Sequence, residues 1–167
     1  MTSRIAAVIV TLLLFSSSAL PKWSMPPAQA CQLLAYLPGM RTGPYRYMET
    51  VGWTCLTSYY VLHPASIDAP NNLAYYVDGT AEQAMELILV LNVYVKYPRE
   101  TTAALTTLAR YTAELTRKAL GQPLPVAATA RIQQGRAGEW QLGAAIVQTR
   151  RKDWPTQKGY TLYVHLK

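Results

Sequence analysis

One long helical pattern between two groups of strand-like segments limits most strongly how this chain can fold. Pro98 stands where a helix can start, and Gly121 followed by Pro123 ends it. Between them apolar residues recur at helical spacing along one stripe. Such a helix must bury its stripe against another element, so the flanking segments have to supply a sheet. The stripe consists of Ala104, Leu105, Leu108, Tyr111, Thr112, Leu115 and Ala119.

The flanking segments have strand character. Residues 73–77 and 85–95 precede the helix and are rich in β-branched and apolar residues, with Asp78-Gly79 as a turn signal between them. Residues 139–149 and 159–166 follow as two further predicted strands. The last one alternates, with one side facing the core and the other facing solvent. The core side is Tyr160, Leu162, Val164 and Leu166, and the solvent side is Thr161, Tyr163, His165 and Lys167.

A second, shorter helix fits residues 125–134, which begin with a proline and are followed by Gly135. The order is therefore strand, strand, helix, helix, strand, strand. This order predicts an α+β fold in which an antiparallel sheet of about four strands carries the helices on one face. We assign residues 71–167 to this domain. Residues 31–70 are interpreted as an irregular segment, rich in cysteine and tyrosine, that packs on it.

The start of the chain has the pattern of a secretory signal. Arg4 precedes an uninterrupted apolar run at residues 5–15, and no acidic residue occurs before Glu49. Residues 1–30 are therefore predicted to be a signal peptide, with cleavage after Ala19 or after Ala30. The apolar stretch is short for a membrane span, so an uncleaved anchor is the second choice. This predicts export to the periplasm or cell envelope of a bacterium.

Two cysteines, Cys31 and Cys55, admit three uses. In an oxidising compartment an even pair can form a disulfide, which is the use we predict. Cleavage after Ala30 would instead place Cys31 at the mature N-terminus, where acylation would tether the protein to a membrane. The two uses exclude each other. Free buried thiols are the third possibility.

The composition indicates one folded, basic domain. Half of the residues are apolar and 15% are charged, which is far from the composition of disordered chains. The net charge is +7, and twelve tyrosines stand against one phenylalanine. The charge favours anionic surfaces such as envelope polymers, and nucleic acid is not an expected partner of an exported protein. Tyrosine-rich surfaces suit binding, because one side of the ring packs while the hydroxyl stays wet.

The first candidate binding site is a basic cluster in the predicted loop between the last two strands. Positive charge beside an indole could hold a phosphate, a polyanion or the face of a sugar. The alternative is a solvated turn whose tryptophan packs on Pro155. The residues are Arg150, Arg151, Lys152, Trp154 and Lys158.

The second candidate is the segment around the first predicted strand of the sheet. Asn72, Tyr75 and Tyr76 could line a groove for a peptide or a glycan, with amides for hydrogen bonds and rings for stacking. The alternative is that the asparagine forms a turn and the tyrosines lie in a half-buried strand.

Catalytic patterns are weak. Cys55 with His63 as its base is conceivable for a thiol enzyme, and the carboxylates of Asp78, Glu82 and Glu86 could supply an acid and a base. His63 and His165 are not at metal-ligand spacing from each other or from the cysteines. No glycine-rich phosphate loop, serine elbow or zinc motif is present. No catalytic residue, metal or cofactor is therefore assigned.

These observations favour a non-enzymatic accessory or binding protein of the cell envelope, whose partner is a protein or an anionic envelope polymer. Two alternatives stay open. One is a small envelope hydrolase or thiol enzyme that uses Cys55 and His63, or the carboxylates from Asp78 to Glu86. The other is a membrane-anchored component of an envelope machine, held through Cys31 acylation or an uncleaved signal.

Overall fold

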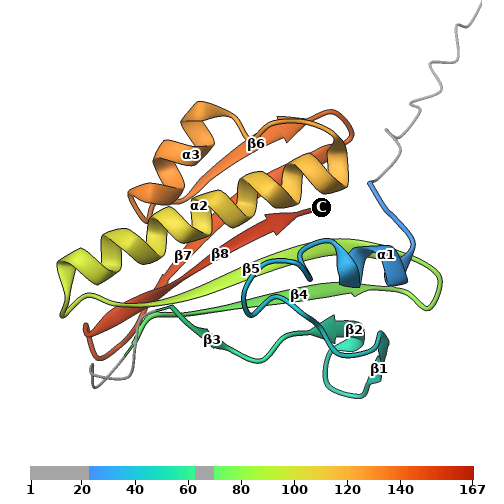
Figure 1. Ribbon diagram of the computed structural model, residues 1–167, viewed down its shortest axis with the longest axis horizontal. Coiled ribbons are helices and arrows are strands. Elements are labelled where there is room, and N and C mark those ends of the chain that lie inside the picture. Colours follow the sequence, from blue (N-terminus) through green and yellow to red (C-terminus); the bar gives the residue numbers. More distant parts are fainter. Residues whose placement is uncertain (1–22, 63–69) are drawn as a thin grey trace, which may run out of the picture.

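A computed structural model describes residues 23–62 and 70–167 (Figure 1). In this part of the chain, three helices and eight strands form an α+β domain, and every strand pair is antiparallel. The helices are α1 (Pro27–Gln32), α2 (Pro98–Leu120) and α3 (Val126–Gln133). The strands are β1 (Arg46–Met48), β2 (Gly52–Leu56), β3 (Tyr60–Val61), β4 (Asn72–Gly79), β5 (Ala84–Tyr94), β6 (Gly138–Leu142), β7 (Ala145–Asp153) and β8 (Gly159–Leu166).

The α+β class is confirmed, but the predicted number of strands and the predicted order of elements are wrong. Residues 46–61, interpreted as part of an irregular segment, supply β1, β2 and β3 to the same sheet. The single strand predicted over residues 139–149 is a hairpin of β6 and β7. Gly143 lies in its two-residue turn with a φ of 61°, a left-handed conformation that glycine adopts without steric cost.

The strands follow the order β1-β2-β4-β5-β8-β7-β6, and β3 pairs with the far end of β4. The two longest pairings place β5 at the centre, between β4 and β8. Asp78 lies opposite Glu86, and Ile88 lies opposite His165. Segments that are distant in the sequence thus share neighbouring positions on the sheet.

One face of the sheet carries the helices. Helix α2 runs along the sheet with α3 beside it, and α1 packs on β4 and β5 (Figure 1). The predicted stripe of α2 is buried from Ala104 to Leu115, whereas Ala119 is partly exposed. This stripe meets the inward side chains of β4, β5 and β8 in one apolar core. The inward side of β8 is Tyr160, Leu162, Val164 and Leu166, as its alternation predicts.

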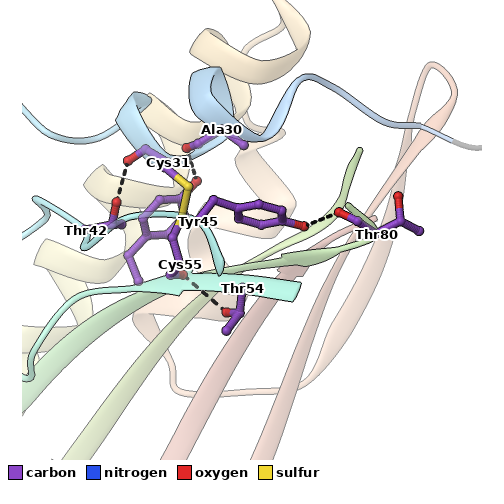
Figure 2. Close-up of a disulfide and its surroundings, with 8 residues drawn as sticks. Ala30, Cys31, Thr42, Tyr45, Thr54, Cys55 and Thr80 are labelled. Atoms are coloured by element: carbon purple, nitrogen blue, oxygen red, sulfur yellow. Dashed lines mark hydrogen bonds between the residues drawn. A yellow bond between two sulfur atoms is a disulfide. The ribbon is translucent and has the colours of Figure 1, made fainter. Parts of the chain in front are cut away.

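The N-terminal part of the described chain belongs to the same core. Ala30 of α1 is fully buried, and its carbonyl oxygen accepts a hydrogen bond of 2.9 Å from the Tyr75 hydroxyl. Cys31 forms a disulfide with Cys55 of β2, which confirms the predicted pair (Figure 2). Met25 forms a bridge with Ala84 at the start of β5. Of the described helices, none is both long and apolar enough to cross a membrane.

Candidate functional site

The opposite side of the sheet, here called the helix-free face, carries charged and aromatic side chains from six strands. Within the described residues no helix packs on it, and yet most of these side chains are half-buried, because they cover one another. Strand pleating sends every second residue to this side. The face includes Arg46, Thr54, Tyr76, Asp78, Glu86, Ile88, Val90, Asn92, Gln148, Arg150, Lys152, Thr161, Tyr163, His165 and Lys167.

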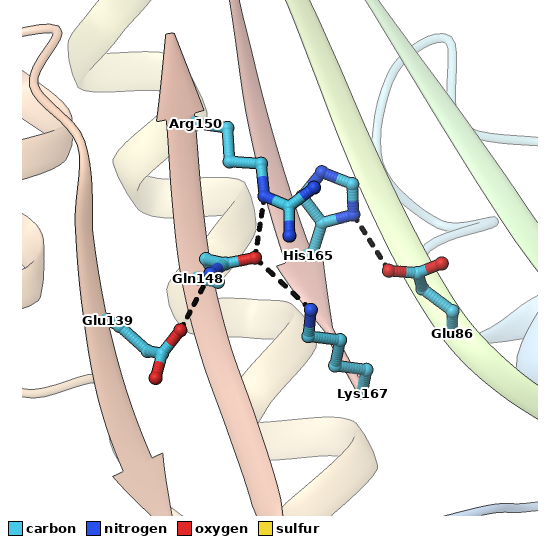
Figure 3. A network of polar contacts seen from close by, with 6 residues as sticks. All are labelled: Glu86, Glu139, Gln148, Arg150, His165 and Lys167. Carbon is cyan, nitrogen blue, oxygen red and sulfur yellow. Dashed lines mark hydrogen bonds and ion pairs between the residues drawn. The ribbon is translucent and has the colours of Figure 1, made fainter.

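A histidine and a glutamate form the centre of this face. The Nδ1 atom of His165 lies 2.8 Å from Oε1 of Glu86, and the histidine side chain is only 14% exposed (Figure 3). An ionised carboxylate only accepts hydrogen bonds, so Nδ1 is the donor. This hydrogen bond, together with the positive charges of Lys167 and Arg150, holds the pKa of Glu86 below its usual value against the opposing effect of burial. Glu86 therefore keeps its charge.

Gln148, opposite His165 on β7, holds a second group of polar side chains beside this pair. Its Oε1 atom accepts hydrogen bonds from Nε of Arg150 at 2.7 Å and from Nζ of Lys167 at 3.2 Å. Its Nε2 atom donates to Oε2 of Glu139 at 2.6 Å. Figure 3 shows these side chains on one side of the strands, with helices behind the sheet. The amide thus sets the position of two cations beside the His165 ring.

Asp78 has the opposite electrostatic setting. Burial raises the pKa of Asp78 above its usual value, and the negative charge of Glu86, directly opposite on β5, raises it further. A hydrogen bond from Thr54 and the nearby His165 work against this shift. Two carboxyls on neighbouring strands therefore have pKa values moved apart, which is an arrangement found at acid–base sites.

Two hollows open on the helix-free face and share Tyr163 and His165. The first has a volume of about 250 Å³ and lies over β4, β5 and β8. The second, of about 360 Å³, lies on the β7 side. The first is lined by Tyr59, Tyr76, Asp78, Ile88, Val90, Asn92, Thr161, Tyr163 and His165, and the second by Arg150, Arg151, Lys152, Tyr163 and His165. An aromatic and polar hollow thus continues into a cationic one.

Tyr76 stands in the wall of the first hollow with its hydroxyl held un-ionised. Burial raises the pKa of this phenol, and a hydrogen bond with Tyr59 raises it further. The Tyr76 hydroxyl is therefore neutral at physiological pH and can donate or accept a hydrogen bond.

The structure divides the predicted basic cluster between two faces. Arg150 and Lys152 point to the helix-free face from β7, which extends to Asp153; their predicted position in a loop is wrong. Arg151 borders the second hollow, but its guanidinium lies on the helix side, where the guanidinium carbon is 3.7 Å from the Tyr160 ring centroid and Nη1 donates to the Gly135 carbonyl oxygen. Strand pleating separates neighbouring residues in this way.

Trp154 and Asn72, predicted in separate sites, are joined by a chain of hydrogen bonds. Trp154 Nε1 donates to Thr161 at 3.0 Å, and Thr161 donates to Asn92 at 2.9 Å. Asn92 donates to Asn72 at 2.9 Å, and Asn72 donates weakly to the Pro70 carbonyl oxygen. The indole also packs edge-on against Tyr94. These contacts occupy both side chains and fix one end of the helix-free face.

The remaining predicted binding residues lie elsewhere. Tyr75 is fully buried beneath α1, since the odd residues of β4 face the core and the even ones face the opposite side of the sheet. Tyr76 is on the helix-free face, as the proposed groove requires. Lys158 is exposed in the loop between β7 and β8. His63 lies outside the described residues.

The disulfide removes thiol chemistry from the oxidised protein. The Sγ atoms of Cys31 and Cys55 are 2.04 Å apart (Figure 2). Cys55 therefore has no thiolate to act as a nucleophile, and Cys31 has no thiol to acylate.

Glu82 lies in the turn before β5 and shares no helical face with Glu86. Over residues 23–62 and 70–167, no three metal-ligating side chains gather.

Sequence reasoning missed the pairing that centres the site. The alternation of residues 159–166 places Tyr163 and His165 on one side, with Lys167 after them, and this part of the prediction is confirmed. Thr161 lies on the same side, but it is only 7% exposed, so its predicted contact with solvent is wrong. Glu86 and His165 are 79 residues apart, and only the pairing of β5 with β8 brings them together. No local pattern encodes that neighbourhood.

The chain was compared with models of known protein families, with curated proteins and with solved structures. None of the three comparisons gives a match. The site is therefore interpreted from its own geometry.

Proposed function

We propose that this protein is an exported binding protein of the cell envelope and that the helix-free face holds its ligand. One observation carries the proposal: an uncovered sheet face keeps the half-buried pair of Glu86 and His165 beside a second hydrogen-bonded group, in which Gln148 holds Arg150 and Lys167. Partly buried charges are costly to a fold unless they are paired, and they cluster at functional sites. The apolar core on the other face does not need them.

Export remains part of the proposal. The disulfide fits an oxidising compartment, where such bonds form and persist. Trp23, Met25 and Ala30 take part in the core and its edge, so cleavage after Ala19 retains these contacts and cleavage after Ala30 removes them. We therefore propose cleavage after Ala19. Retention as a membrane-anchored component stays a prediction that depends on residues 1–22.

The test is photocrosslinking in cells that produce the protein. A photoreactive phenylalanine replaces Tyr163 in the hollow, or Tyr36 as the control, which is exposed and contacts Glu114 of α2 on the helix side. We expect an adduct from position 163 and none from position 36. Adducts from both positions or from neither would contradict a binding role for this face.

A second candidate function is hydrolysis, favoured by the opposed pKa directions of Asp78 and Glu86. Asp78 would act as the acid and Glu86 as the charged partner. In that case the protein releases reducing ends from oligosaccharides, and Asp78→Asn abolishes the release. Oligosaccharides that stay intact over a long incubation would remove this candidate and leave the binding proposal unaffected.

A further inference from the structure

A further hollow, of about 390 Å³, lies at the opposite edge of the sheet from Arg150. It is formed by β1, β2 and the segment that leads into β1, and it contains two arginines, Arg41 and Arg46. Hydroxyl groups and apolar side chains complete it: Thr42, Met48, Thr54, Leu56 and Ser58. Two guanidinium groups in one hollow are suited to carboxylate or phosphate oxygens.

This hollow opens on the helix-free face. Arg46 lies directly opposite Thr54, and Thr54 lies directly opposite Asp78. Residues paired across neighbouring strands project to the same side of a sheet. Figure 2 shows Thr54 on the side of β2 away from the disulfide, which is anchored on the helix side. The arginine hollow and the two hollows around Tyr163 therefore belong to one surface.

The cations at the two ends of this surface are available to a ligand. In the described part of the chain, Arg41, Arg46 and Lys152 form no ion pair, and Arg150 is bonded only to the neutral amide of Gln148. Arg41, Arg46, Arg150 and Lys152 are all exposed. Within the described residues none of these cations is taken up by an ion pair, and they favour a ligand with an anionic group at each end.

The middle of the surface has a different chemistry. Tyr59, Tyr76 and Tyr163 surround an apolar floor of Ile88 and Val90. Tyrosine rings and hydroxyls beside an apolar floor suit a ligand that has both flat apolar faces and hydroxyl groups. The carboxylates of Asp78 and Glu86 accept hydrogen bonds from hydroxyls but repel closely spaced phosphates, so they act against nucleic acid and against an anionic bilayer.

We propose that the ligand is an extended acidic glycan that crosses the strands from the Arg41–Arg46 hollow to the Arg150–Lys152 hollow. The path passes over β1, β2, β4, β5, β8 and β7, which are five strand spacings or about 24 Å. Sugar rings lie on the tyrosines in the middle, and acidic groups meet the arginines at the ends. The inference rests on the proposed function and adds the class and the extent of the ligand.

The test uses calorimetry to measure the binding of maltooligosaccharides of increasing length, each carrying a carboxylate at both ends, to the disulfide-bonded protein. Unmodified maltooligosaccharides of the same lengths are the neutral comparison, and polyglutamate is the comparison for charge alone. We expect the dissociation constant to fall about tenfold or more once the chain reaches both hollows, because a second set of charged contacts is added. Neutral chains and polyglutamate bind more weakly at every length.

Charge reversal separates the two ends. Arg41→Glu with Arg46→Glu, and Arg150→Glu with Lys152→Glu, each remove the gain from length, so that long chains bind either variant about tenfold more weakly than the parent protein. The matched control is Arg99→Glu with Arg131→Glu, two exposed arginines on the helices. This control changes the net charge equally and leaves the dissociation constants unchanged.

Each contrary outcome is distinct. Affinity that is independent of length, with loss only in the Arg150 and Lys152 variant, overturns the extended path and leaves the proposed function standing. Equal binding of polyglutamate, or of anionic vesicles, overturns the glycan. A protein adduct at position 163, with no glycan binding, also overturns the glycan while the binding face stands. No adduct and no binding overturn both proposals.

Discussion

At the scale of single residues, the two facing carboxyls of the helix-free face make opposite contributions to stability. For Asp78→Asn we expect a higher free energy of unfolding at pH 7, by less than about 1 kcal/mol, because solvent screens a half-exposed carboxyl. The folded pKa of Asp78 is raised, so its charge destabilises the fold above that pKa. Below the usual aspartate pKa, Asp78 is protonated in both the folded and the unfolded state, so the difference in stability between the variant and the parent protein disappears. Urea unfolding across pH 3–8 measures it.

Glu86→Gln is the matched control with the opposite sign. The folded pKa of Glu86 is lowered, so its charge stabilises the fold above the usual glutamate pKa, and this stability is lost as the pH falls through the folded pKa. We expect the variant to be less stable than the parent protein at pH 7 and equal to it in acid. Two variants that shift stability in the same direction at pH 7 would contradict the assigned environments.

At the scale of elements, the end of α2 depends on the backbone of one glycine. Gly121 caps the helix with a φ of 66°, and a Cβ atom placed there meets no atom within 4 Å. For Gly121→Ala we expect a loss of about 1 kcal/mol that comes only from the left-handed conformation. Gly43→Ala, at a glycine without positive φ, is the control and should be close to neutral. Thermal unfolding of both variants compares them; equal losses would contradict a conformational cause.

The elements that were predicted correctly are those whose signals are local. Helix α2 has its proline start, its stripe and its glycine end within one segment, and β8 has strict alternation. The hairpin of β6 and β7 was missed although Gly143 carries the signal, since glycine followed by alanine fits a two-residue turn. The short strands β1 and β3 have almost no pattern of their own and form only against β2 and β4.

The candidate site was harder to predict than the strands, because local signals do not show which strands lie side by side. Alternation alone predicts that Tyr163, His165 and Lys167 share a wet side of β8. Their partners come from β5 and β7, and Arg46 comes from the far edge of the sheet. Arg150 and Lys152 were selected for their charge, and pleating, rather than charge, removes Arg151 from the same face. Residue types could thus be chosen from the sequence, but their assembly required the strand order.

At the scale of the whole molecule, the disulfide attaches the N-terminal segment to a sheet whose centre is held by other contacts. Cys31 and Cys55 close a loop with a sequence separation of 24 residues. On the chain-entropy account, reduction lowers the free energy of unfolding by about 3 kcal/mol. The core of β5, α2 and β8 is formed by residues between Leu87 and Leu166, which lie outside this loop. Reduction should therefore loosen α1 and β2 more than β5, β8 and α2.

Hydrogen exchange with and without reductant measures that difference. We expect faster exchange after reduction at α1 and β2, because the bond joins these two elements directly, whereas amides of β5, β8 and the buried side of α2 keep their protection. The double variant Cys31→Ala with Cys55→Ala should reproduce the pattern without reductant. A uniform rise in exchange would show that the N-terminal segment and the sheet unfold as one unit. Ligand bound across both hollows of the helix-free face should then slow exchange at β2 and β7 together, since an extended chain contacts the two edges of the sheet at once.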